Sequence, residues 1–216
     1  MKNLSSLWEW FVCAMFPQRC IVCRREGALL CPVHKKFKPA PPSRASFEHL
    51  DEIFAAVAYD DIISKKIIDG FKFRGISDIA EIMADEIVYR NKKFLENSVL
   101  VPIPLHWTRK LWRGFNQSEV LAKKIAVKVP STEVINILER VQKTEQQATL
   151  SKQERIKNTQ NAFNVLENSA RFFDKQIILI DDVVASGATL DAAAKVLKIA
   201  GFKNVKAVVF ARGGKV

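Results

Sequence analysis

The feature that most constrains the fold is a run of four apolar residues, 177–180, which leads directly into Asp181 and Asp182. A short apolar run of this kind is typical of a buried strand. A turn of small residues, 185–189, follows the acidic pair, and a helical pattern then continues to Ala200. We therefore expect a strand, a loop and a helix start, which is an arrangement typical of α/β folds.

The expected loop has the residue types that bind a phosphate beside a ribose. Backbone N–H groups at a helix start point outward, and the positive end of the helix dipole attracts anions there. Two adjacent carboxylates can accept hydrogen bonds from ribose hydroxyls or help to hold Mg²⁺. The candidate phosphate-binding residues are Ala185, Ser186, Gly187, Ala188 and Thr189. The alternative is a helix cap without a ligand, but a cap accounts for only one of the polar residues in this loop.

An apolar strand that ends in two aspartates also begins phospho-acceptor receiver domains. In those domains the pair lies near the N-terminus, and the acceptor aspartate lies on a later strand. Here 34 residues follow Asp182, and Asp191 is the only acid among them. The position of the pair therefore excludes a receiver domain.

Apolar runs alternate with amphipathic helical patterns from residue 46 onward, which predicts an α/β fold with a mostly parallel sheet flanked by helices. The expected strands are 53–59, 99–103, 134–138, 162–165, 176–180 and 205–211, and the expected helices are 62–71, 79–89, 116–127 and 189–200. The segment 139–161 has no long apolar stripe. A loop of that length is usually functional or mobile.

The N-terminal part of the sequence predicts a small zinc knuckle. Cys20, Cys23, Cys31 and His34 form two pairs of metal ligands separated by a short loop, which suits a tetrahedral Zn²⁺ site. Cys13 is an alternative fourth ligand, and reduced buried cysteines with a surface histidine are the alternative to a metal site. A fully ligated site would be structural, because it leaves no open position for chemistry.

The sequence also predicts a division into two parts and no membrane insertion. Residues 1–45 would comprise a helix over 4–16, the knuckle and a proline-rich linker, and residues 46–216 would form the main domain. No stretch approaches the roughly 20 apolar residues that span a bilayer. Because the cysteines gather in the first 31 residues, a disulfide-stapled secreted fold is not expected, and we predict a cytoplasmic protein.

The chain carries 34 Lys and Arg against 23 Asp and Glu, a formal net charge of +11. Such an excess favours polyanionic partners through long-range attraction. The alternative is an ordinary solvated basic surface. Because the basic residues are scattered along the sequence, charge alone identifies no partner.

Four further segments carry a resemblance to the ComF family of the type I phosphoribosyltransferases. The segments 101–105 and 113–117 resemble the element where relatives hold pyrophosphate, and 71–75 is similar to a Lys-Phe-x-Gly stretch of that family. Residues Arg140, Thr144, Gln147, Leu150, Arg155 and Asn158 match its R-x3-T-x2-Q-x2-L-x4-R-x2-N segment. The family usually has a fourth cysteine where this sequence has His34, and many members have Thr-Thr at 185–186.

The resemblance implies Mg²⁺-assisted transfer of a phosphoribosyl group from phosphoribosyl pyrophosphate to an unknown acceptor. Asp181 and Asp182 would hold the ribose, and the loop 185–189 would hold the 5-phosphate. The pyrophosphate would be held by Lys72, Arg113, Arg140 and Arg155. Further ligand-binding candidates are Asn116, Gln117, Arg140, Thr144, Gln147 and Arg155. The residues agree with this, since prolines at 102 and 104 end a strand and the residues from Arg140 to Asn158 could fold over a ligand as a lid. The alternatives are a solvated turn around Arg113 and an exposed helical hairpin in place of the lid.

The resemblance also implies a role in natural competence, that is, in DNA uptake and transformation. Under a second hypothesis the chain is a non-catalytic competence factor with a sensory or vestigial phosphoribosyl site. Its partners would then be single-stranded DNA, a competence helicase or a recombination mediator. The basic surface and the knuckle would make those contacts.

Overall fold

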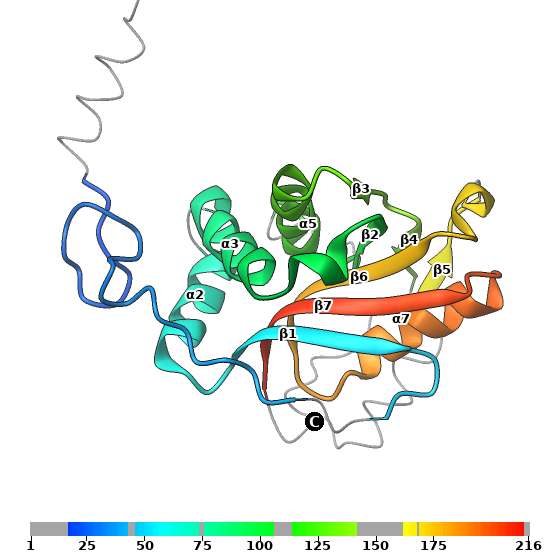
Figure 1. Ribbon diagram of the computed structural model, residues 1–216, viewed down its shortest axis with the longest axis horizontal. Coiled ribbons are helices and arrows are strands. Elements are labelled where there is room, and N and C mark those ends of the chain that lie inside the picture. The colour runs from blue at the N-terminus through cyan, green and yellow to red at the C-terminus, as the bar shows by residue number, and fades with distance from the viewer. Residues whose placement is uncertain are drawn as a thin grey trace, which may run out of the picture.

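The computed structural model describes residues 17–42, 46–73, 76–105, 114–141, 162–167 and 169–213. Figure 1 shows a layered α/β fold, with the cysteine-bearing segment beside α2. The helix expected over 4–16 and most of the segment 139–161 lie outside the described residues. No helix in the described ranges has both the length and the apolarity to cross a membrane.

The central sheet has five strands, and every neighbouring pair in it is parallel. The order across the sheet is β1 (Glu52–Ala58), β7 (Asn204–Arg212), β6 (Gln176–Val184), β2 (Ser98–Pro102) and β3 (Glu133–Val134). The prediction of a mostly parallel sheet flanked by helices is confirmed.

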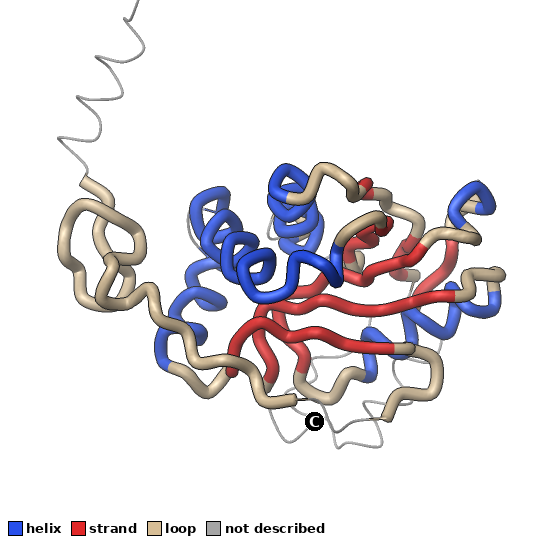
Figure 2. Tube along the Cα trace, in the orientation of Figure 1, coloured by secondary structure: helices blue, strands red, loops and turns tan. Residues whose placement is uncertain are grey.

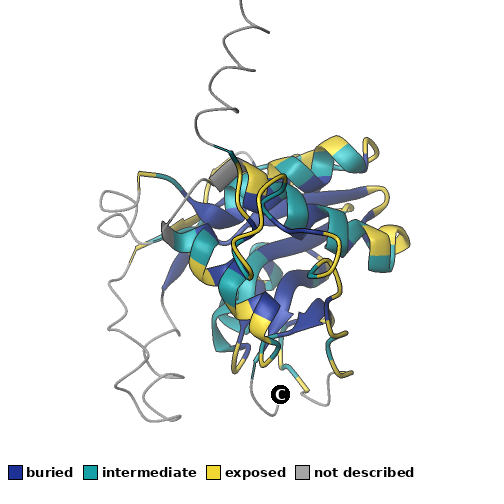
Figure 3. Cartoon of the chain, turned by 90° about the vertical axis from the view of Figure 1, so that its left-hand side faces the viewer, coloured by how far each residue is buried: buried dark blue, intermediate teal, exposed yellow. Residues whose placement is uncertain are grey.

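Helices cover both faces of this sheet, as Figure 2 shows. One buried cluster joins the sheet to α2 (Ile62–Phe73), α3 (Ile76–Leu95) and α5 (Gln117–Lys128), and a second joins it to α7 (Ala188–Ile199). In β6, Ile178 and Ile180 belong to the first cluster, whereas Ile177 and Leu179 belong to the second. A strand that is buried on both faces must be apolar throughout. The burial colouring in Figure 3 accordingly concentrates the buried residues in the strands.

Two strand predictions needed correction. The single strand expected over 134–138 is divided, because the chain leaves the parallel sheet after Ile135, whose N–H donates to the carbonyl of Leu100 at 3.0 Å. The chain then forms β4 (Leu138–Arg140), which pairs with β5 (Phe163–Val165) as an antiparallel two-stranded sheet. Strand β6 extends four residues beyond Ile180, because β7 continues to pair with it as far as Val184 and Arg212. A 3-10 helix at Ala170–Phe172 was not predicted.

The proline-rich segment after the knuckle forms an antiparallel addition to the outer edge of β1. The Ala58 N–H donates to the Lys38 carbonyl at 2.9 Å, and the Ala40 N–H donates to the Ala56 carbonyl at 3.3 Å. Phe37 is buried and packs edge-on against Phe210, with ring centroids 5.6 Å apart. This stretch therefore contributes to the core and to the sheet.

The segment before β1 lies along α7. The Asp191 carboxylate accepts hydrogen bonds from the backbone N–H groups of His49 and Leu50, at 2.9 and 3.1 Å. Asp51 accepts a hydrogen bond from Lys198 at 2.7 Å near the other end of the helix. These contacts fix the chain along the length of α7.

Candidate functional site

The acidic pair lies at the carboxyl end of β6. Asp181 is opposite Val209 of β7, and Pro102 of β2 is opposite Ile180. We expected the strand to end at Ile180, but both aspartates belong to β6 and are half-buried. Because they are in the sheet, their backbone positions are set by strand pairing. That rigidity suits carboxylates that must hold a ligand in one orientation.

The Asp181 carboxylate is already engaged by the protein. Its Oδ1 atom accepts a hydrogen bond from the Ser118 hydroxyl at 3.0 Å and another from the Asp182 N–H at 2.9 Å. Burial, reinforced by the neighbouring charge of Asp182, raises the pKa of Asp181 to about 7, although the two hydrogen bonds and the charge of Arg140 act in the opposite direction. Asp181 therefore titrates near neutral pH in the absence of a ligand.

The small-residue loop closes on Gly187, the N-cap of α7, which has φ 77°. A Cβ atom at this position would lie 2.2 Å from the Phe47 ring, so both the backbone angle and the contact with Phe47 require glycine. Ser186 and Ala185 are exposed, whereas Ala188 and Thr189 are half-buried at the helix start. The Ser186 hydroxyl accepts from the Ala188 N–H at a long 3.5 Å. Helix α7 therefore begins beside the acidic pair. Its N-cap residue is a glycine and has no side chain that could cover the helix N-terminus.

A second helix start faces the same edge of the sheet. Asn116 caps α5 by accepting from the Ser118 N–H at 3.2 Å, and its Nδ2 donates to the Ile103 carbonyl at 3.1 Å. The side-chain amide of Asn116 therefore joins the end of β2 to the start of α5, through its nitrogen and its oxygen respectively. Gln117 is 3% exposed, and its Nε2 atom has no hydrogen-bond partner among the described residues.

A cavity of about 250 Å³ lies between the end of β2, the start of α5 and the strand β4. It brings together residues from three segments that are well separated in the sequence. Its lining comprises Pro102, Pro104, Leu105, Asn116, Glu119, Asn136, Leu138, Glu139 and Arg140. The predicted proline element and Arg140, the first residue of the predicted lid, therefore line the same cavity.

The two ends of the predicted lid are held together by β4 and β5. The Val141 N–H donates to the Ala162 carbonyl at 3.0 Å, and the Arg140 guanidinium lies 5.3 Å from the centre of the Phe163 ring. Residues 138–141 and 162–165, on either side of the rest of this segment, are therefore adjacent in space. Thr144, Gln147 and Arg155 lie outside the described residues.

Of the remaining predicted residues, Lys72 is half-buried in the last turn of α2, and Arg113 lies outside the described residues. Ser118 and Phe47 were not among the residues predicted from the sequence. Ser118 is at the second position of a helix that follows a cap, which is a recognisable signal for a polar contact. For Phe47 no local pattern indicates contact with Gly187.

The knuckle brings the four predicted metal ligands together. The ligand atoms of Cys20, Cys23, Cys31 and His34 all lie within 4.8 Å of one another. The Sγ atoms of Cys23 and Cys31 are 3.8 Å apart, and Cys20 Sγ is 3.7 Å from His34 Nδ1. Bonds of about 2.3 Å in a tetrahedron place sulfur atoms about 3.8 Å apart, so this group can hold a metal ion.

The knuckle backbone also favours a thiolate at Cys20. Burial raises the pKa of Cys20, but backbone N–H groups, foremost that of Cys31, outweigh it and lower the pKa to about 6. Arg24 and Gly27 have positive φ values of 64° and 111°, which fold the loop between the cysteine pairs. Cys20 and Cys31 belong to the same buried cluster as residues of α2 and α3. Cys13 lies outside the described residues.

A parallel sheet with an acidic pair and a small-residue loop at its carboxyl edge defines the class of phosphoribosyltransferase-type domains. In agreement, residues 112–215 match the family described as phosphoribosyl transferase domain.

Similarity to curated relatives indicates a particular family within this class. Competence protein F of Haemophilus influenzae is 31% identical over 113 residues, which cover 52% of this chain and 49% of the relative. Competence protein ComFC of Bacillus subtilis is 37% identical over 145 residues, 64% of this chain and 55% of the relative. Competence protein ComFC of Streptococcus pneumoniae is 35% identical over 144 residues, 66% and 60% respectively. The domain match and these relatives support a place for the chain in the ComF family of the phosphoribosyltransferase superfamily, and the chain spans about half to three fifths of the length of these relatives.

Proposed function

We propose that this chain binds phosphoribosyl pyrophosphate together with Mg²⁺ at the carboxyl edge of its sheet. The observation that carries the proposal is the continuity of β6, the acidic pair and the loop that closes on Gly187. Asp181 and Asp182 would accept hydrogen bonds from the two ribose hydroxyls. The loop 185–189 then offers the N-terminus of α7 to the 5-phosphate.

The cavity beside β2 is where the pyrophosphate would lie. Its walls include Pro102 and Pro104, and the guanidinium of Arg140 supplies positive charge there. Lys72, Arg113 and the lid residues Thr144, Gln147 and Arg155 would add further contacts, with Asn116 and Gln117 at the start of α5. Bound Mg²⁺ would neutralise part of the pyrophosphate charge, and Asp181 and Asp182 are oxygen donors of the kind that it prefers.

The chemistry supported by this arrangement is phosphoribosyl transfer. The bond from ribose C1 to pyrophosphate breaks with its electron pair leaving on pyrophosphate, and an acceptor forms a new bond to C1. The protein orients the donor and stabilises the departing anion in a site shielded from water. The predicted lid, from Arg140 to Asn158, would close over the ligand.

We further propose that Zn²⁺ occupies the Cys20, Cys23, Cys31 and His34 group in a structural role. A segment of this size has too few apolar residues for a core of its own, so metal binding would supply folding free energy. The buried positions of Cys20 and Cys31 against α2 and α3 would transmit that stability to the main domain.

The relatives named as competence proteins support a role for this chain in DNA uptake. In that role the net charge of +11 would favour single-stranded DNA, and a competence helicase or recombination mediator would be a protein partner. A sensory phosphoribosyl site without turnover is the second form of this proposal. It predicts donor binding without release of pyrophosphate.

Calorimetry with phosphoribosyl pyrophosphate and Mg²⁺ tests the donor site. The double variant Asp181→Asn with Asp182→Asn should weaken binding at least about tenfold, because charged hydrogen-bond acceptors are lost. Asp174→Asn is the matched control, since Asp174 is an exposed aspartate that pairs only loosely with Lys203 at 3.5 Å. Wild-type affinity in the double variant would overturn the site assignment.

A further inference from the structure

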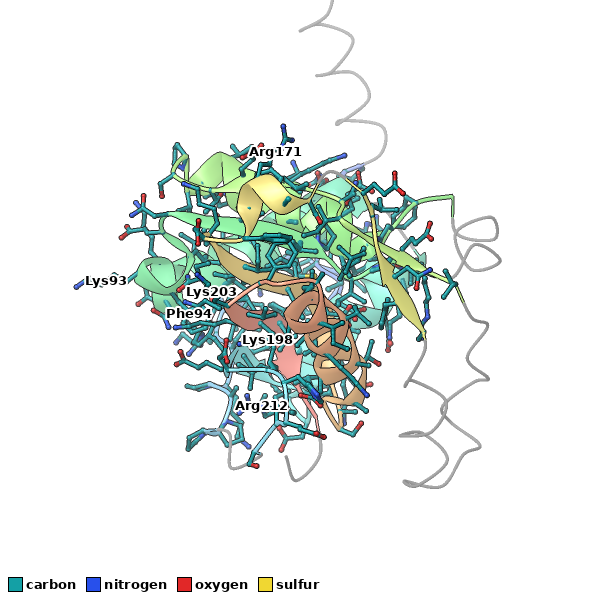
Figure 4. All side chains as sticks on the ribbon, turned by 90° about the vertical axis from the view of Figure 1, so that its right-hand side faces the viewer. Lys93, Phe94, Arg171, Lys198, Lys203 and Arg212 are labelled. Carbon is teal, nitrogen blue, oxygen red and sulfur yellow. The ribbon has the colours of Figure 1, made fainter. Side chains whose placement is uncertain are left out.

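Arg212, the last residue of β7, is a buried charged side chain that the proposed chemistry does not use. It is 4% exposed. Its Nη1 atom donates to the Pro41 carbonyl at 2.9 Å. Within the described ranges, its Nε and Nη2 atoms have no hydrogen-bond partner. Figure 4 shows Arg212 at the opposite end of the view from the exposed Arg171.

A buried guanidinium with unused donors is unfavourable in a folded protein. Each unpaired buried donor costs about 1 to 3 kcal/mol, and more when the group is charged. Burial also lowers the pKa of Arg212, because removing the charged guanidinium from water is unfavourable. The contact with Pro41 uses only one of the donor nitrogens, and a neutral donor could make that contact equally well. A structural role alone therefore leaves the charge unexplained.

The two unused nitrogens are the pair that recognises an oxyanion. In a guanidinium, the Nε–H bond and one N–H bond of Nη2 point to the same side and form a rigid fork. Carboxylate and phosphate oxygens match this fork through two parallel hydrogen bonds. The geometry of the unused donors thus specifies a planar or tetrahedral oxyanion.

The backbone of Arg212 lies at the carboxyl edge of the sheet, where the acidic pair and the phosphate loop also lie. Arg212 is opposite Val184 of β6, the residue directly before the phosphate loop. In the sheet order, β7 and β2 lie on opposite sides of β6. Arg212 therefore lies on the opposite side of β6 from the strand beside the cavity assigned to pyrophosphate. Two sources of an oxyanion remain on this side, the 5-phosphate of the donor and an anionic group of the acceptor.

We propose that the Nε–Nη2 fork of Arg212 is an oxyanion subsite of the ligand-binding edge, which takes a phosphate or carboxylate group. Arg212 would also position the segment before β1, because the same guanidinium holds the Pro41 carbonyl. The choice between the two sources rests on the proposed function, whereas the subsite itself rests on the burial and unused donors of Arg212.

The test observes the Arg212 Nε–H group directly in nitrogen-15 NMR spectra of the full chain. Arg212→Lys identifies the resonance by removing it, and triple-resonance assignment serves if that variant does not fold. Benzoate and inorganic phosphate are titrated first alone and then with saturating phosphoribosyl pyrophosphate and Mg²⁺. Calorimetry should show at least about tenfold weaker oxyanion binding in Arg212→Lys, and no change in the control Arg171→Lys.

A saturable shift of the Arg212 Nε–H resonance supports the subsite. If phosphoribosyl pyrophosphate alone produces the shift and blocks benzoate, the source is the 5-phosphate; if benzoate or phosphate still shifts it with the donor bound, the source is the acceptor. A resonance that none of the three ligands moves overturns the proposal. Failure of the donor to bind in calorimetry, with a benzoate shift retained, would overturn the proposed function and leave the subsite standing.

Discussion

The Ser118 hydroxyl donates a hydrogen bond of 3.0 Å to Asp181 Oδ1 and so joins the start of α5 to the end of β6. The two residues are 63 positions apart in the sequence. The contact connects the two helix-start regions of the candidate site through one carboxylate. It stabilises the charged form of Asp181 and opposes the effect of burial.

Removing this hydroxyl should raise the pKa of Asp181 above its value of about 7, because the carboxylate loses a donor that favours its charged form. In Ser118→Ala, carbon-13 NMR of the Asp181 carboxyl group should therefore show titration at higher pH. Ser118→Thr keeps a hydroxyl and should restore a value close to that of the wild type. An unchanged titration in Ser118→Ala would contradict the contact.

The raised pKa of Asp181 also predicts a pH dependence of stability. The folded pKa of about 7 exceeds the ordinary value of 3.8, so the folded state binds more protons between these values, and stability falls as pH rises through that window. Asp181→Asn should remove this loss and stabilise the chain at pH 8 by about 1 to 2 kcal/mol, with little gain at pH 4. Thermal unfolding of the ligand-free protein at both pH values measures the difference. Asp174→Asn should show no such gain, and an equal gain at both pH values would contradict the assigned pKa.

The affinity for the donor should depend on the same titration of Asp181, but it should increase as pH rises, whereas stability decreases. Because the ionised carboxylate of Asp181 is a stronger hydrogen-bond acceptor for ribose hydroxyls than the protonated form, affinity for phosphoribosyl pyrophosphate should rise as pH increases through about 7. Calorimetry between pH 6 and 8 measures this slope, and a buffer-dependent heat would report proton release. An affinity that is flat across the range would indicate that Asp181 is already ionised.

Gly187→Ala should destabilise the chain and weaken donor binding. The left-handed conformation costs about 1 to 2 kcal/mol for alanine, and the clash with Phe47 adds about 1 to 3 kcal/mol. Gly114→Ala is the matched control, because Gly114 has a similar φ of 80° but nothing within 4 Å of an added Cβ. Denaturant unfolding should show a clearly larger loss for Gly187→Ala, and Phe47→Ala in the same chain should recover part of the difference. Equal losses of stability in the two glycine variants would show that Phe47 does not clash with an alanine side chain at position 187.

The knuckle should hold one zinc ion per chain. Elemental analysis should show that Cys31→Ser and His34→Ala lose the metal, whereas Cys13→Ser retains it. Chelation should lower the melting temperature of the whole chain, because buried Cys20 and Cys31 pack with α2 and α3. Retention of zinc by His34→Ala together with its loss in Cys13→Ser would assign the fourth ligand to Cys13.

The sequence alone determined the parts of the fold that depend on local pattern. The unbroken apolar run 177–180 indicated a strand buried on both faces, and the structure gives it one face in each core cluster. The spacing of Cys20, Cys23, Cys31 and His34 predicted a metal-binding group, and their ligand atoms do converge. These features could be read directly because neighbouring residues in the chain carry the whole signal.

Strand ends and long-range contacts were decided by the tertiary structure. Strand β6 reaches Val184 because β7 pairs with it there. The strand expected over 134–138 divides because the chain leaves β2 after Ile135 and pairs with β5 instead. Contact between Phe47 and Gly187, and between Arg212 and Pro41, joins segments with no common local pattern. Hydrogen bonding and burial depend on which segments meet in space, and only the folded arrangement of the sheet and its helices sets that.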